Sequence, residues 1–144
     1  MTAIGCAERS NEAFSAMLID IDGFSEISET NGYVAGDSVI MNTVAQPREA
    51  VGTAGFIGRL NEYEFMLFLK GMDRQRVGDV AAAIRQAVAK YANGGIAYSV
   101  SIGAVAFDAS SRVGLHFPLI HAACAQALHL AKKKGRGEMV ISAA

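Results

Sequence analysis

The sequence changes from apolar to acidic within the stretch AMLIDIDGFSEI, which covers residues 16–27. Its first half predicts a buried β-strand that carries Asp20 and Asp22 at its C-terminal end, because a short apolar run of this length suits a strand. Its second half has helical spacing and predicts a helix that ends where Gly32 breaks the pattern.

Periodicity and turn residues predict the remaining elements. Asp37 is the expected N-cap of a second helix, and Pro47 is expected to end that helix near Gln46, since proline lacks the N–H of a helical hydrogen bond. Asp73 and Pro118 are expected to begin two further helices. The other strands are expected over residues 56–60, 64–70, 98–107 and 139–141.

The resulting order is β-α-α-β-β-α-β-α-β. It predicts an α+β fold of the ferredoxin-like kind, with helices on one face of a mostly antiparallel sheet of about five strands. The chain has 144 residues, a length that suits one domain, so we expect a single domain over residues 1–144.

Composition narrows the class of protein. A hydrophobic content of 51% with 19% charged residues excludes a disordered chain, and a net charge of −1 argues against nucleic acid as a partner. Cys6 and Cys124 are expected to be reduced thiols, with Cys124 in the core. No apolar run approaches the ~20 residues of a membrane span, and no signal peptide is visible. We therefore expect a cytoplasmic protein with no membrane partner.

Five short patterns follow one another on these elements. They are Asp20-Ile21-Asp22-Gly23-Phe24-Ser25-Glu26-Ile27, Gly32-Tyr33-Val34-Ala35-Gly36-Asp37, Arg59-Leu60-Asn61-Glu62-Tyr63-Glu64-Phe65, Ser101-Ile102-Gly103 and Ala131-Lys132-Lys133-Lys134-Gly135-Arg136. Together, over about residues 16–142, they resemble the GGDEF domain of diguanylate cyclases, which has a palm-type fold.

The resemblance implies a site in which two domains, each holding one GTP, meet face to face and condense the two molecules into cyclic di-GMP. In this chemistry metal ions neutralise the triphosphate while a ribose hydroxyl attacks. Asp20 and the Ile21 carbonyl occupy the metal-ligand positions. Asp37 occupies the position that reads the guanine edge, and Lys132 and Arg136 occupy the positions of the phosphate-contacting cations.

Several positions depart from the family pattern. The guanine-binding Asn is Ser28, which cannot offer the paired donor and acceptor of an amide. The signature Gly-Gly-Asp/Glu-Glu-Phe is Asn61-Glu62-Tyr63-Glu64-Phe65, so both glycines are replaced. Its third position, a metal-ligating carboxylate in the family, is the neutral phenol of Tyr63, a poor ligand for Mg²⁺. Glu64 remains as a weak metal ligand beside Asp20.

The product-inhibition site of the family is also expected to be absent. Its Arg-x-x-Asp motif corresponds to Gly52-Thr53-Ala54-Gly55, which has no arginine to chelate a guanine. We therefore expect no second cyclic di-GMP site.

Simpler interpretations exist for the same residues. Asp20 and Asp22 could be solvent-facing ends of a strand, and Tyr63 a half-exposed turn aromatic. The cationic run that ends at Arg136 could be a solvated helix terminus, where cations suit the helix dipole.

Three functions remain open at this stage. The first is a catalytically inactive, regulatory GGDEF-like domain in cyclic di-GMP signalling, a weak GTP sensor that controls a protein partner or a linked phosphodiesterase domain. Its candidate ligands are GTP and Mg²⁺, held at the remnants of the site, with no catalytic residue in the altered turn. The second is a nucleotide-free scaffold for protein interaction or homodimerisation. The third is a divergent, active diguanylate cyclase.

Overall fold

The acidic-ended run of the sequence forms the central strand of a five-stranded sheet. The computed structural model describes residues 14–52, 55–71, 73–90, 96–107 and 117–143. The sheet order is β2-β3-β1-β4-β5, and all neighbouring pairs are antiparallel except β4 with β5. The strands are β1 (Phe14–Ile21), β2 (Gly55–Arg59), β3 (Glu64–Lys70), β4 (Val100–Phe107) and β5 (Met139–Ala143).

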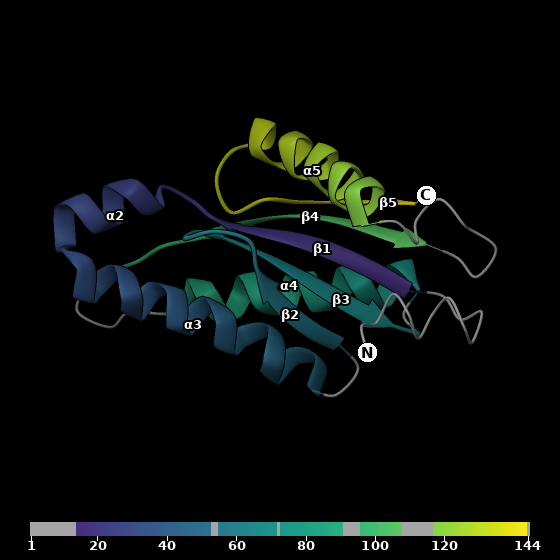
Figure 1. Cartoon of the computed structure of the whole chain (residues 1–144), viewed down its shortest axis with the longest axis horizontal. Helices are drawn as coiled ribbons and strands as arrows, with labels where there is room; N and C mark the ends of the chain where they lie inside the picture. The colour runs from purple at the N-terminus through teal and green to yellow at the C-terminus, as the bar shows by residue number, and fades with distance from the viewer. Residues whose placement is uncertain (1–13, 53–54, 72, 91–95, 108–116, 144) are drawn as a thin grey trace.

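Helices cover both faces of the sheet, as Figure 1 shows. The helices are α2 (Phe24–Asn31), α3 (Tyr33–Val51), α4 (Arg74–Ala89) and α5 (Phe117–Lys134). Helices α3 and α4 pack on one face of the sheet and α5 packs on the other. The predicted α+β class and element order are confirmed. The prediction that all helices lie on one face is wrong, because β1 is buried along its whole length and a strand apolar on both sides needs a cover on each.

Two apolar cores follow from this arrangement. In the first core, side chains on one face of the sheet pack against α3 and α4, and Ile19 and Ile84 are fully buried there. In the second core, side chains on the other face of the sheet pack against α5, and this core includes Leu18 and Cys124. Cys124 is a buried free thiol, as predicted, and burial raises its pKa to about 12. Cys6 lies outside the described residues.

The second helix differs from its prediction at both ends. It begins at Tyr33 after Gly32, so Asp37 is an exposed residue inside the helix rather than its cap. It also continues through Pro47 to Val51. The buried residues of α3 include Val39, Thr43 and Pro47 at helical spacing, so packing against the core outweighs the hydrogen bond that proline removes.

One contact sets how closely α5 approaches the sheet. Gly103 of β4 lies directly under α5, and a Cβ atom there would overlap the backbone of Cys124 and Leu128. The helix is thereby held close to the sheet, and α5 ends beside the C-terminal end of β1. Among the described helices, none combines the length and apolar character needed to cross a bilayer.

Candidate functional site

A cleft of about 460 Å³ opens where β1 ends and β3 begins. Because β1 runs antiparallel to β3 and β4, the C-terminal end of β1 lies beside the first residues of both neighbours. The end of α5 closes the same corner. The cleft is lined by residues 20–26 and by Tyr63, Lys132, Gly135 and Arg136.

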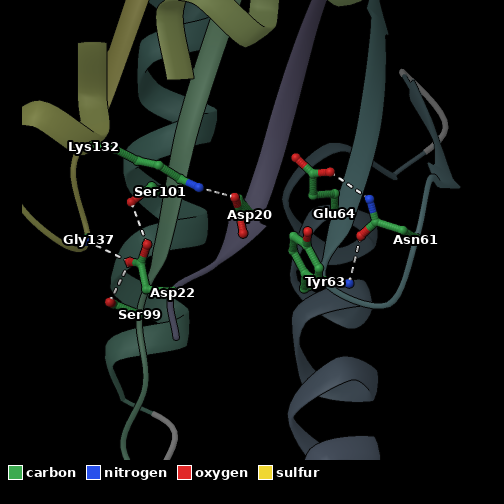
Figure 2. A network of polar contacts seen from close by, with 9 residues as sticks. All are labelled: Asp20, Asp22, Asn61, Tyr63, Glu64, Ser99, Ser101, Lys132 and Gly137. Carbon is green, nitrogen blue, oxygen red and sulfur yellow. Dashed lines mark hydrogen bonds and ion pairs between the residues drawn. The ribbon is translucent and has the colours of Figure 1, made fainter. Parts of the chain in front are cut away.

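Asp20 and Lys132 form an ion pair in this cleft (Figure 2). Only 3% of Asp20 is exposed, so the hypothesis that it is a solvent-facing strand end is wrong. Burial raises the pKa of the Asp20 carboxyl, and the Lys132 ammonium offsets part of that rise. Partial burial opposes the charge on Lys132, but the hydrogen bond and charge of Asp20 outweigh it and raise the Lys132 pKa.

Asp22 is a structural crosslink rather than a solvent-facing residue. Its carboxylate accepts hydrogen bonds from the Ser99 hydroxyl at 2.7 Å, the Ser101 hydroxyl at 2.8 Å and the Gly137 N–H at 2.8 Å (Figure 2). These donors come from the start of β4 and from the turn after α5. Asp22 therefore fixes the loop that carries Arg136 over the cleft.

The altered signature turn is closed by its own side chains. The Asn61 amide accepts a hydrogen bond from the Tyr63 N–H at 3.0 Å and donates one to Glu64 Oε1 at 2.6 Å. Arg59 Nε donates to the Asn61 carbonyl at 2.9 Å. The Tyr63 carbonyl accepts from the Ile21 N–H at 2.9 Å, which holds the turn against the end of β1.

These contacts bear on the expected metal ligands. Asp20 and Ile21 line the cleft, but the Asp20 carboxylate forms an ion pair with Lys132. Glu64 does not line it and bonds to Asn61 instead. Within the described ranges, no group of three or more His, Cys, Asp or Glu side chains could hold a metal ion. With Glu64 bonded to Asn61 and a phenol at position 63, the cleft offers fewer oxygen ligands for a pair of Mg²⁺ ions than the family pattern implies.

Arg136 stands at the open edge of the cleft. Its guanidinium lies 3.2 Å from Glu26, both side chains are largely exposed, and such a pair contributes little to stability. The same guanidinium lies over Gly23, where φ is 62° and a Cβ would come within 2.8 Å of it. A side chain at Gly23 would push Arg136 away.

The two expected guanine-reading positions lie elsewhere. Ser28 packs beside Gly36 at the contact between α2 and α3, and Asp37 follows on the exposed side of α3. Neither lines the cleft that holds Lys132 and Arg136. Residues 53 and 54, within the expected remnant of the product-inhibition motif, lie outside the described residues.

Two residues of the site were not singled out from the sequence. The sequence indicates Asp22 only as a strand-end carboxylate, although Ser99, just before β4, and Ser101, on β4, are suitable donors for it. The sequence pattern marks Asn61 only as the replacement of a signature glycine. Its side-chain oxygen accepts a hydrogen bond from the backbone N–H of Tyr63, two residues later in the chain. Asparagine commonly forms this kind of turn.

Comparison with known proteins agrees with this geometry. The family described as "Diguanylate cyclase, GGDEF domain" matches residues 1–138. The diguanylate cyclase TpbB of Pseudomonas aeruginosa is 29% identical over 140 residues, which is 94% of this chain and 32% of TpbB. The chain thus spans about a third of the length of that relative.

Solved structures of diguanylate cyclases have the same fold as this chain. The active GGEEF domain of a diguanylate cyclase from Vibrio cholerae has a TM-score of 0.85 at 26% identity, covering 96% of this chain and 88% of that one. The diguanylate cyclase SiaD of Pseudomonas aeruginosa, in complex with its activator SiaC, shares the fold with a TM-score of 0.85 at 23% identity, covering 96% of this chain and 54% of that one. The chain belongs to the GGDEF family of diguanylate cyclase domains.

Proposed function

We propose that this GGDEF domain does not synthesise cyclic di-GMP and instead regulates cyclic di-GMP signalling by binding GTP weakly. One observation carries the proposal. At the third signature position the cleft presents the phenol of Tyr63 where the family places a metal-ligating carboxylate, and Lys132 occupies the remaining carboxylate of Asp20.

The chemistry explains why this arrangement disfavours catalysis. Attack of a ribose hydroxyl on a triphosphate develops negative charge that metal ions must neutralise. A phenol carries no negative charge with which to bind Mg²⁺, so it is a poor ligand in place of a carboxylate. Glu62 adds a further negative charge to the turn. Since few anionic ligands remain, we expect the metal-dependent rate to be lost.

The remaining groups suit a phosphate ligand better than a reaction. Lys132 and Arg136 reach the cleft from the end of α5 and the loop after it. We assign them to the phosphates, and we assign Ser28 and Asp37, which lie outside the cleft on α2 and α3, to the guanine edge. Binding of GTP at this site would regulate a protein partner or a linked phosphodiesterase domain in the cytoplasm. The complex of the fold relative SiaD with its activator supports such a partner.

Calorimetric titration with GTP tests the binding half of the proposal. We expect micromolar affinity, and Lys132→Ala should weaken it about tenfold or more, because a charge-assisted hydrogen bond to phosphate is lost. Lys133→Ala is the matched control, since Lys133 is exposed on the same helical turn. Thermal unfolding of each variant checks that the fold survives.

Absence of heat up to millimolar GTP would contradict the sensor hypothesis. It would favour the alternative in which the fold serves as a nucleotide-free scaffold for a partner or for a second copy of the chain. Equal affinities of the wild type and Lys132→Ala would remove Lys132 from the phosphate site.

Restoring the family signature tests whether Tyr63 prevents metal binding at this site. The triple change Asn61→Gly, Glu62→Gly and Tyr63→Asp should make GTP affinity at least about tenfold stronger in Mg²⁺ than in chelator, because it adds a carboxylate and removes a charge. The double change without Tyr63→Asp is the control. An equal response of both variants to Mg²⁺ would show that Tyr63 is not the block.

A further inference from the structure

The replacement at position 63 changes the kind of hydrogen bond that the turn can offer. A carboxylate only accepts hydrogen bonds and repels phosphate unless a cation lies between them, whereas a phenol donates. Tyr63 is 40% exposed and lines the cleft together with Lys132 and Arg136. Its carbonyl accepts a hydrogen bond from the Ile21 N–H, so the backbone of Tyr63 is held beside the end of β1.

We infer that this cleft binds the phosphate chain of a nucleoside triphosphate directly, without a divalent cation, with the Tyr63 hydroxyl as a donor beside Lys132 and Arg136. The inference rests on the proposed function and adds to it the form in which the nucleotide is recognised. The free, fully anionic nucleotide is the ligand, rather than its magnesium complex.

Each carboxylate at the cleft already has a partner that a metal ion would have to displace. The buried carboxylate of Asp20 is paired with the half-exposed ammonium of Lys132. Asp22 accepts three hydrogen bonds from neighbouring elements. Glu26 is exposed and lies beside Arg136. A divalent ion at Asp20 would therefore have to displace the Lys132 ammonium, which already neutralises that buried carboxylate.

The two cations keep donors for a phosphate. An ammonium has three N–H donors and a guanidinium has five. Among the described residues, Lys132 donates one N–H to Asp20 and Arg136 donates one to Glu26. Phosphate oxygens can therefore bind both side chains while the ion pairs persist. Tyr63 adds a neutral donor at the place where the family would need a metal.

Calorimetric titration of the whole chain with GTP, in chelator and in excess Mg²⁺, tests the inference without any variant. We expect binding in chelator to be at least as tight as in Mg²⁺, because the metal removes charge from the phosphates that the cations recognise. Tyr63→Phe should weaken binding in chelator about tenfold, the effect of losing one hydrogen bond to a charged group. Tyr33→Phe, at an exposed position on α3, should leave it unchanged.

The possible outcomes distinguish a failure of metal-free recognition from a failure of the proposed function. Binding that requires Mg²⁺ would overturn metal-free recognition and leave the proposed GTP sensor standing. No binding in either buffer would overturn both. An affinity of Tyr63→Phe equal to that of the wild type would remove the hydroxyl from the site. A Tyr63→Asp variant that loses binding in chelator and regains it with Mg²⁺ would support the role assigned to the phenol.

Discussion

Replacing Gly103 with alanine is expected to destabilise the domain by about 3 kcal/mol or more, at the upper end of the cost of overpacking a core. The added methyl would overlap the backbone nitrogen of Leu128 and the carbonyl oxygen of Cys124. Backbone atoms of a packed helix cannot rotate away as a side chain can, so α5 must move off the sheet. Denaturant unfolding followed by circular dichroism measures the change.

Gly58→Ala provides the matched control. Gly58 also lies in a strand, but nothing stands within 4 Å of the place its Cβ would occupy. Alanine there should be neutral or stabilise the fold by up to about 1 kcal/mol, because it restricts the unfolded chain. Equal effects of the two substitutions would contradict the close approach of α5 to β4.

Replacing Asp22 with alanine is the second change with a large expected effect. It leaves the buried Ser101 hydroxyl, the Ser99 hydroxyl and the Gly137 N–H without their shared acceptor. We expect a loss of about 3 kcal/mol, since each hydrogen bond to a charged group contributes about 1.5–3 kcal/mol and the effects overlap. GTP binding should weaken as well, because the loop that carries Arg136 is released.

Asp79→Ala is the control for that experiment. Asp79 is an exposed residue of α4, and its substitution should change stability by less than about 0.5 kcal/mol. Asp22→Asn keeps the shape but turns one acceptor into a donor, so it should fall between the two. If Asp22→Ala unfolds at the same denaturant concentration as the wild type, Asp22 is not the crosslink described above.

The sequence predicted much of the fold because its local signals were strong. The apolar run of β3 was predicted with its observed ends, Glu64 and Lys70, and Asp73 caps α4 by accepting a hydrogen bond from the Arg76 N–H. The start of α3 was missed because Gly32, rather than Asp37, precedes the helix. Its length was missed because packing of Pro47 into the core is a tertiary effect.

The candidate site was predicted in part. Asp20 and Lys132 lie 112 positions apart, so only the resemblance to a known family could suggest that they share a site. The two side chains can pair because α5 packs closely against β4 at Gly103. No local sequence pattern predicts that packing. The bond between Asn61 and Glu64 likewise follows from the geometry of the turn.

The most direct test of the central claim is a product assay. The chain is incubated with GTP and either Mg²⁺ or Mn²⁺, and cyclic di-GMP is measured by chromatography beside an active diguanylate cyclase as positive control. The proposed function predicts no cyclic di-GMP above the protein-free blank. Cyclic di-GMP that accumulates in proportion to the amount of chain, and that disappears in Asp20→Asn, would contradict it and establish a divergent cyclase.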